Sequence, residues 1–244
     1  MKKVLLLLML FILLFVNYQP AYSLRALSAN YELVLNVPTK RLLLYNKGLL
    51  EKEYPVGVGK ALTPTPLGEF KITRKISNPA WVNPYRQSNV ISSGPSNPIG
   101  QYWLGFALNT KNQEYGFHAT SDLNSIGKAS THGCIRMYPQ HVKELFDLVK
   151  IGTAVHIIYN PVEVKEYENK LFIRAYPDIY GYMDDSLYIK FAKNQLTGAN
   201  LVQEKNLYKA IESKDEKDYF IGWTGAQNTI PTDDSVPDGK GGLN

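Results

Sequence analysis

The chain has 244 residues, of which 44% are hydrophobic and 20% are charged, and its formal net charge at pH 7 is +5. This composition supplies enough apolar side chains for a hydrophobic core and excludes a wholly disordered chain. The length suits one domain of ordinary size with added segments, or at most two small domains. The basic residues are spread along the sequence without a long block, so nothing indicates a nucleic-acid partner.

The N-terminus has the organisation of a secretory signal peptide. Two lysines precede an uninterrupted apolar run over residues 4–16, and the small-residue pattern Ala21-Tyr22-Ser23 follows. A basic start, a short apolar segment and a small-x-small site are the parts of such a signal, and the run is shorter than the ~20 residues of a membrane span. We therefore expect a cleaved signal peptide over residues 1–23 and an exported protein of the periplasm or cell wall. An uncleaved anchor is the alternative.

The main body of the chain is dominated by strand patterns. Short segments with alternating or continuous apolar residues are bounded by Pro, Gly and Asn, which predicts strands separated by turns. The predicted strands cover residues 31–37, 40–45, 49–58, 69–75, 101–108, 114–118 and 153–159. An apolar stripe predicts one helix over residues 139–149. Residues 77–100 are rich in Asn, Pro, Ser and Gly and are predicted to form a long surface loop.

The character of the sequence changes after Pro161. A further hairpin is predicted over residues 162–175, and two helical stretches follow between residues 186 and 213. We therefore expect a main domain followed by a small C-terminal α/β extension, in a chain that acts as a monomer. The expected divisions are a linker over residues 24–30, a catalytic domain over 31–160, the extension over 161–224 and a disordered tail over 225–244.

Cys134 is the only cysteine of the chain. Cysteines of exported proteins usually pair in disulfides, and a single cysteine has no partner within its own chain. It then forms a link to another chain or provides a reactive thiol, with a buried and inert thiol as the alternative. The residues around Cys134 therefore decide how it is interpreted.

Two histidines lie near this cysteine, His118 at the end of a predicted strand and His132 two residues before Cys134. An imidazole can take the thiol proton and leave a thiolate–imidazolium pair. The helix predicted over residues 139–149 is expected to lower the thiol pKa a little further. Gly133 lets the backbone approach a substrate carbonyl, and the amides of Gly133 and Cys134 would then bind an oxyanion.

The other candidates have structural alternatives. Arg136 either pairs with a substrate carboxylate, whose shape its guanidinium matches, or forms an internal salt bridge. His141 is expected at the surface of the helix, and His156 is expected to be a structural residue of a strand. The histidines near Cys134 would also suit zinc, but structural zinc sites usually have closer paired ligands. We therefore expect no metal and no cofactor.

These residues resemble the catalytic motif of the L,D-transpeptidases with a YkuD-type domain. In that motif a histidine is followed, after a gap, by Ser/Thr-His-Gly-Cys, an apolar residue and Arg or Asn. The chain has His118 and then Thr131-His132-Gly133-Cys134-Ile135-Arg136. Further similar stretches occur in the family's order, and the resemblance covers about residues 31–159, with weaker similarity up to Tyr180. These stretches are residues 63–70, 94–100 and 103–105.

The resemblance implies a fold and a reaction. The fold would be mainly β, a YkuD-like β-sandwich or barrel with one or two short helices. The reaction would be acyl transfer on the stem tetrapeptide of peptidoglycan. Cys134 would attack the carbonyl of the third residue and release the terminal D-alanine, with His118 as the base. An amine of a neighbouring stem peptide, or of a wall-attached protein, would then accept the acyl group.

The resemblance also implies supporting roles. The carbonyl of Ala119 would orient the catalytic histidine, and His132 and Gly133 would shape the oxyanion site. Many family members have Gly in place of Ala119, which is tolerable unless that position needs a positive φ. The expected substrate contacts are Arg136, Thr131, Trp103 and Tyr115.

Two other functions stay open. A thiol carboxypeptidase or endopeptidase would form the same acyl-enzyme and pass it to water, so sequence does not separate it from a transpeptidase. A non-catalytic module that binds the cell wall is the third interpretation. It does not account for a histidine and a lone cysteine in a catalytic motif.

Overall fold

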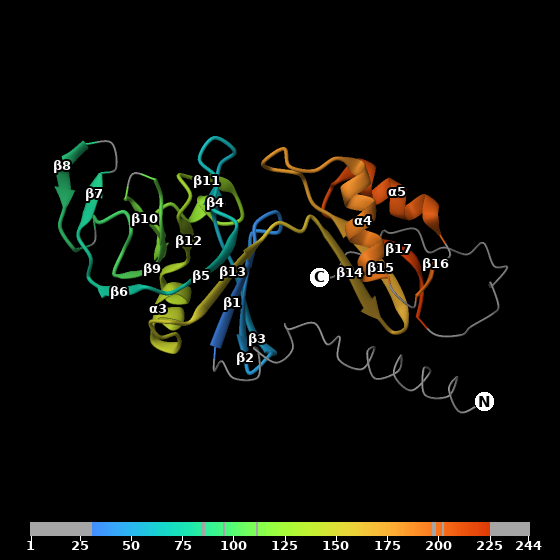
Figure 1. Ribbon diagram of the computed structural model, residues 1–244, viewed down its shortest axis with the longest axis horizontal. Helices are drawn as coiled ribbons and strands as arrows, with labels where there is room; N and C mark the ends of the chain where they lie inside the picture. The colour runs from blue at the N-terminus through green and yellow to red at the C-terminus, as the bar shows by residue number, and fades with distance from the viewer. Residues whose placement is uncertain are drawn as a thin grey trace, which may run out of the picture. The chain divides into compact units, whose positions relative to one another are not determined.

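The computed structural model describes residues 31–83, 86–94, 96–110, 112–196, 199–201 and 203–224. The described chain forms two compact units (Figure 1). The first contains the described residues up to Pro161 together with Asp178–Tyr182, and the second contains Val162–Pro177 and the residues from Met183 onward. The signal peptide over 1–23, the linker over 24–30 and the tail over 225–244 lie outside the described residues and stay predictions.

The first unit is built mainly of strands, as expected. Its strands are β1 (Tyr31–Asn36), β2 (Arg41–Asn46), β3 (Leu49–Pro55), β4 (Val58–Gly59), β5 (Gly68–Lys71), β6 (Arg74–Ser77), β7 (Trp81–Asn83), β8 (Arg86–Ile91), β9 (Tyr102–Leu108), β10 (Glu114–Ala119), β11 (Ala129–Thr131), β12 (Ile135–Met137) and β13 (Ala154–Ile158). Its helices are a short 3-10 helix η1 (Leu123–Ser125) and α3 (Pro139–Leu148). The mainly β fold is confirmed.

Two sheets supply most of the core of this unit. One has the strand order β3-β2-β1-β13-β5 and the other β12-β10-β9-β6. Alternation on β1 and β2 turns Leu33, Leu35, Leu42 and Leu44 inward, and all four are fully buried. Helix α3 lies against β9 and β10 and begins at a proline, which suits the first helical position.

The second sheet brings the two halves of the catalytic motif together. Strand β10 pairs with β9 on one side and, in parallel, with β12 on the other. The register places His118 opposite Arg136 and Phe117 opposite Ile135. Cys134 immediately precedes β12, so residues separated by sixteen positions in the sequence come to adjacent strands at one end of the sheet.

The prediction of a long loop over residues 77–100 was wrong. That segment contains a hairpin, because β7 pairs with β8 in antiparallel fashion. Strand β12, which lies between Cys134 and helix α3, was not predicted. Strands of three residues such as β7 and β12 are too short to show alternation.

The second unit is a small α/β structure. Its elements are β14 (Val162–Tyr167), β15 (Lys170–Ala175), α4 (Asp185–Gln195), β16 (Asn200–Leu201), α5 (Glu204–Ser213) and β17 (Tyr219–Trp223). The sheet order is β14-β15-β17-β16, and residues of both helices share its core, among them Tyr188 and Leu207. The predicted hairpin and helices are present, whereas strands β16 and β17 were not predicted.

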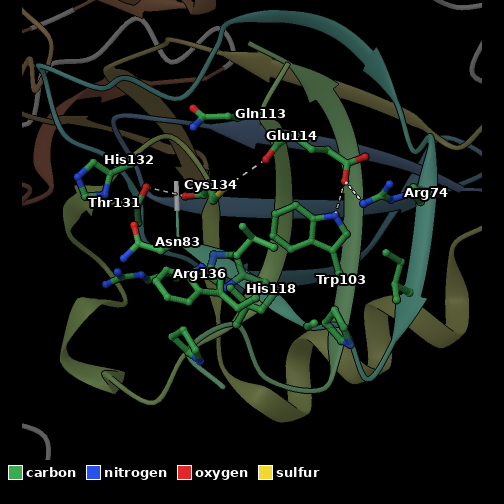
Figure 2. A pocket seen from close by; sticks show the side chains of 17 residues that line it. Arg74, Asn83, Trp103, Gln113, Glu114, His118, Thr131, His132, Cys134 and Arg136 are labelled. Carbon is green, nitrogen blue, oxygen red and sulfur yellow. Dashed lines mark hydrogen bonds and ion pairs between the residues drawn. The ribbon is translucent and has the colours of Figure 1, made fainter. Parts of the chain in front are cut away.

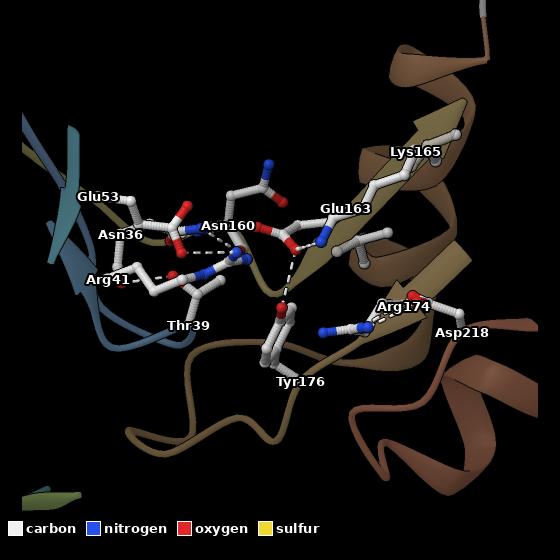
Figure 3. A network of polar contacts seen from close by, with 12 residues as sticks. Asn36, Thr39, Arg41, Glu53, Asn160, Glu163, Lys165, Arg174, Tyr176 and Asp218 are labelled. Atoms are coloured by element: carbon white, nitrogen blue, oxygen red, sulfur yellow. Dashed lines mark hydrogen bonds and ion pairs between the residues drawn. The ribbon is translucent and has the colours of Figure 1, made fainter. Parts of the chain in front are cut away.

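Within each unit, polar contacts join segments that are distant in the sequence (Figure 3). In the first unit, the Asn36 amide group donates to the Asn160 carbonyl at 2.9 Å, and the Asn160 amide donates back to the Asn36 side chain at 3.0 Å. In the second unit, the Arg174 guanidinium binds the Asp218 carboxylate through two hydrogen bonds of 2.6 and 2.8 Å. The Asn36 side chain thus binds the backbone of Asn160, and the Arg174–Asp218 pair has the two-bonded geometry that strengthens such ion pairs.

Candidate active site

A cavity of about 610 Å³ lies in the first unit, and the two halves of the motif meet in its wall (Figure 2). Strands β6, β7, β9 and β10 and the loop before β12 supply most of the lining. The lining residues are Arg74, Ile76, Pro79, Ala80, Trp81, Val82, Asn83, Pro98, Ile99, Trp103, Gln113, Glu114, His118, Thr131, His132, Cys134 and Arg136.

His118 is buried in this wall, with 6% of its surface exposed. Its Nδ1 lies 2.5 Å from the carbonyl oxygen of Ala119, which is the contact that the resemblance implied. A carbonyl only accepts, so Nδ1 carries the proton and Nε2 is the basic nitrogen. Burial lowers the pKa of His118 to about 4, and the hydrogen bond to Ala119 only partly opposes this shift. The imidazole is therefore neutral near pH 7 and able to accept a proton.

Cys134 lies in the same cavity wall. Burial raises the pKa of its thiol to about 11, while the Gly116 amide and the positive charge of Arg136 act in the opposite direction. Its sulfur lies 3.9 Å from the carbonyl oxygen of Glu114. The expected lowering of this pKa by helix α3 is not observed, because the helix begins beyond strand β12 and its field fades within a turn. The resting pair is a neutral thiol and a neutral imidazole.

The backbone before Cys134 is held by Thr131. The Gly133 amide donates to the Thr131 hydroxyl at 3.0 Å, and this hydroxyl donates to the Cys134 carbonyl at 2.6 Å. The expectation that the Gly133 amide is free to bind an oxyanion was therefore wrong, because its hydrogen is already used. Among the described residues, no acceptor is found for the amide of Cys134 itself. That amide is the donor available beside the thiol.

Gly133 is required for two physical reasons. Its φ is +108°, a conformation that side chains disfavour. A Cβ at this position would also lie 2.4 Å from Cε1 of Tyr115. Tyr115 itself does not line the cavity, contrary to the expectation of a substrate contact. Because residues alternate along strand β10, Glu114 and His118 reach the cavity while Tyr115 packs on the other face, against Phe106.

Arg136 combines the two interpretations proposed for it. Its guanidinium lies 3.7 Å from the carboxylate of Asp122, and it also lines the cavity. The exposed fractions of the two side chains are 28% and 63%, so the ion pair is open to solvent. Such pairs are weak, and the guanidinium remains accessible to a carboxylate in the cavity. Thr131, His132 and Trp103 also line the cavity, as expected for residues near a substrate.

Ala119 is accommodated without strain. It belongs to strand β10, and it is not among the described residues with positive φ. A Cβ at Gly100 would lie 2.6 Å from the Cβ of Ala119. The methyl group that distinguishes this chain from many family members therefore occupies space that Gly100 leaves open.

A polar group beside His118 was missed by the sequence reasoning. The Trp103 indole stacks on the His118 ring, with centroids 5.6 Å apart and an interplanar angle of 19°. The indole N–H donates to Glu114 at 2.8 Å, and Arg74 lies 3.2 Å from the same carboxylate oxygen. Glu114 is four residues before His118 on one strand, so alternation alone would place both side chains on the same face.

The remaining histidines lie elsewhere. Nε2 of His156 lies 2.6 Å from the Glu32 carboxylate on the neighbouring strand, in agreement with a structural role. His141 was expected at the surface but is half-buried, with its ring against Tyr54 and Tyr138. Within the described ranges, no group of three His, Cys, Asp or Glu side chains is placed to hold a metal ion.

With this geometry in place, comparison with known proteins identifies the family. Residues 30–157 match the sequence profile of YkuD, described as the L,D-transpeptidase catalytic domain. The chain belongs to the L,D-transpeptidase family. The match includes both halves of the catalytic motif and the first unit up to strand β13. The resemblance inferred from the motif is thereby confirmed.

Individual relatives of the L,D-transpeptidase family cover about half of the chain. YqjB of Bacillus subtilis (strain 168) is 38% identical over 51% of this chain and 69% of its own length. YkuD of Bacillus licheniformis is 40% identical over 52% of this chain and 65% of its own length. YbiS of Escherichia coli (strain K12) is 32% identical over 54% of this chain and 45% of its own length. All three names designate L,D-transpeptidases.

Solved structures of L,D-transpeptidases are also similar. The structure of LdtMt1 in complex with imipenem is 19% identical, with a TM-score of 0.43, over 53% of this chain and 59% of that chain. The structure of a mutant L,D-transpeptidase from Enterococcus faecium is 22% identical, with a TM-score of 0.44, over 53% of this chain and 50% of that chain.

In the part of this chain that the structure describes, no helix is long and apolar enough to cross a membrane.

Proposed function

We propose that this protein is a peptidoglycan L,D-transpeptidase that uses Cys134 as its nucleophile. The observation that carries the proposal is the arrangement of His118 in the cavity that contains Cys134. Its Nδ1 is held by the Ala119 carbonyl at 2.5 Å, which leaves Nε2 as a neutral base in a cavity wall that also contains Cys134, the one thiol of the chain. Nucleophile, base and orienting group are the parts of an activated acyl-transfer site.

In the donor half-reaction, the stem tetrapeptide occupies the cavity. Sγ of Cys134 attacks the carbonyl carbon of the third residue while Nε2 of His118 takes the thiol proton. The carbonyl oxygen becomes an oxyanion, which the Cys134 amide binds. The tetrahedral intermediate then collapses, the peptide bond breaks, and the terminal D-alanine leaves with the proton that His118 returns to its amine. Arg136 pairs with a carboxylate of the donor.

In the acceptor half-reaction, an amine attacks the thioester on Cys134. His118 takes the amine proton, the new amide forms, and the proton returns to the departing thiol. The acceptor is a side-chain amine of a second stem peptide, which gives a 3-3 crosslink, or an amine of a wall-attached protein. Water in the place of the amine makes the same site a carboxypeptidase.

Product analysis by mass spectrometry tests this function. The purified protein is incubated with a muropeptide that carries a tetrapeptide stem. Release of D-alanine together with a crosslinked dimer supports transpeptidation. Release of D-alanine without a dimer would indicate carboxypeptidase activity instead. An unchanged muropeptide would contradict both activities and favour a non-catalytic module that binds the cell wall. Cys134→Ser is the matched inactive control, since it keeps the size of the side chain.

We also propose that the protein is exported and that it works in the periplasm or cell wall. The signal-like residues 1–23 and a substrate located outside the cytoplasm support this. Intact mass of the protein recovered from the cell envelope tests it. The expected mature chain begins at Leu24, and a full-length mass would instead support an uncleaved anchor.

A further inference from the structure

The segment Asp178–Tyr182 lies beyond the residues that match the family profile, yet it belongs to the first unit. It is fixed there by Tyr159, which follows strand β13. The Tyr159 hydroxyl donates to the Asp178 carboxylate at 2.5 Å and accepts from the Tyr180 amide at 2.9 Å. The rings of Tyr159 and Tyr180 stack with centroids 5.4 Å apart. These contacts place the Tyr180 side chain.

The Tyr180 hydroxyl closes a loop formed by residues 59–65. It donates to the Gly59 carbonyl at 2.9 Å and accepts from the Thr65 amide at 3.0 Å. The Gly59 amide in turn donates to the Thr65 hydroxyl at 2.9 Å. The loop is tight, since a Cβ at Gly59 would lie 2.5 Å from the Thr65 nitrogen. Both ends of the loop are therefore joined through one phenol.

This loop holds the backbone that precedes the nucleophile. The Thr65 hydroxyl donates to the Gly133 carbonyl at 3.0 Å. The Lys60 amide and the Thr63 hydroxyl both donate to the Thr131 carbonyl, at 3.1 and 3.0 Å. Thr65 is 1% exposed, so water does not replace these bonds readily. The carbonyls on either side of His132 are thus fixed by a loop that Tyr180 closes.

We propose that Tyr180 is a positioning residue for acyl transfer at Cys134. Through loop 59–65 it fixes the peptide units of residues 131–133 and so aims the Cys134 amide at the oxyanion. Tyr180 does not line the cavity, so it acts through the loop and not on the substrate. This inference rests on the proposed function, because it assigns a residue to the same reaction.

The test compares Tyr180→Phe with Tyr182→Phe. Both changes remove one hydroxyl from tyrosines close in sequence. Tyr182 is 49% exposed, and its ring contacts Tyr159 and Tyr180. Each variant is acylated with a carbapenem, a reaction that forms an oxyanion, and alkylated with iodoacetamide, a reaction that forms none. Thermal unfolding shows whether each variant remains folded.

We expect Tyr180→Phe to slow carbapenem acylation by about 10- to 100-fold, the loss typical of a misplaced oxyanion donor. Alkylation of Cys134 should stay within about twofold, because that step needs only the thiolate. Tyr182→Phe should match the wild type in both reactions. Equal acylation of Tyr180→Phe and wild type, or an equal loss in both reactions, overturns the positioning role.

Variants of Thr65 provide an independent test of the same path. Thr65→Val removes the hydroxyl that binds the Gly133 carbonyl, whereas Thr65→Ser keeps it. We expect the valine variant to lose acylation as Tyr180→Phe does and the serine variant to retain it. If both variants react as fast as the wild type, the loop does not position the site. A wild type that is neither acylated nor able to release D-alanine overturns the proposed function, and the role of Tyr180 with it.

Discussion

At the scale of residues, the site keeps His118 and Cys134 uncharged. Burial is the larger influence on both, and it lowers the pKa of His118 to about 4 and raises that of Cys134 to about 11. An imidazolium–thiolate pair is therefore a minor species of the free protein near neutral pH. Under the proposed function, proton transfer from sulfur to His118 would therefore accompany attack on the substrate.

The first prediction concerns the reactivity of this thiol. Because the thiolate is the reactive form, the rate of Cys134 alkylation by iodoacetamide should rise continuously from pH 6 through pH 9. The rate is measured by intact mass, with Cys134→Ser as the unlabelled control. A plateau that begins below pH 7 would show a preformed ion pair and contradict the neutral resting state.

The second prediction concerns stability in acid. The pKa of His118 is about 4 in the folded protein and ordinarily about 6.5, so the unfolded chain binds more protons between these values. The free energy of unfolding should therefore fall as pH is lowered through this window, by up to about 3 kcal/mol from this residue. Urea unfolding at pH 7 and pH 4 measures the change.

The matched variant for this measurement is His118→Gln, which does not titrate. It should lose less stability than the wild type between the two pH values, because other groups contribute equally to both proteins. The same loss in both proteins would refute the assignment to His118.

At the scale of elements, strand β12 and the turn before it determine the position of Cys134. Strand β12 places Cys134 beside β10, and Gly133 makes the turn that precedes it possible. Gly133→Ala adds a methyl group to a residue with φ +108° and 2.4 Å from the Tyr115 ring. We expect it to destabilise the fold by about 2–4 kcal/mol, the sum of a backbone and a packing cost, and to abolish acylation.

Gly127→Ala is the control for the third prediction. Gly127 has a φ of +78°, and a Cβ there would meet nothing within 4 Å. The free energy of unfolding of Gly127→Ala should fall by only about 1–2 kcal/mol, from the backbone conformation alone, and the variant should retain acylation. Urea unfolding and the rate of carbapenem acylation compare the two variants, and equal stability in both would contradict the clash with Tyr115.

The sequence was sufficient to predict the longer elements and to single out His118 and Cys134, which the fold brings into the wall of one cavity. Strands β1, β2, β9 and β10 and helix α3 were close to their predicted bounds, because each has enough residues to show its period. The hairpin β7–β8 and strand β12 were missed; β7 and β12 have three residues each, which is too few to show a period. The pKa shifts also required the structure, because they depend on burial by residues distant in sequence.

Glu114 and Tyr115 show how far the positions of side chains could be predicted from the sequence. The place of Glu114 in the cavity wall could have been predicted, because Glu114 shares one face of strand β10 with His118. Tyr115 was assigned to the substrate from its place near the motif, but alternation turns it away. The contacts of Tyr180 could not be predicted from the sequence, because its partners Gly59 and Thr65 are more than a hundred residues away.

At the scale of the whole molecule, the first unit does not end where the family match ends. The match covers residues 30–157, but the first unit also includes Asp178–Tyr182. A chain truncated after Pro161 lacks the contacts of Tyr159 and of loop 59–65 with this segment. We expect it to unfold at a lower temperature than the full chain and to be acylated more slowly.

A chain that ends at Thr224 is the control for this fourth prediction, because it keeps both described units. It should unfold and react as the full chain does. If the chain ending at Pro161 also matches the full chain in both measurements, residues 178–182 contribute nothing to the first unit.

The central claim is that Cys134 carries the acyl group of the donor. Intact mass and peptide mapping of the protein, rapidly quenched after mixing with a tetrapeptide-stem muropeptide, test it most directly. The predicted result is a thioester adduct on Cys134 with the mass of the donor less D-alanine, absent in Cys134→Ser. Release of D-alanine by Cys134→Ser at the wild-type rate, or an adduct on another residue, would contradict it.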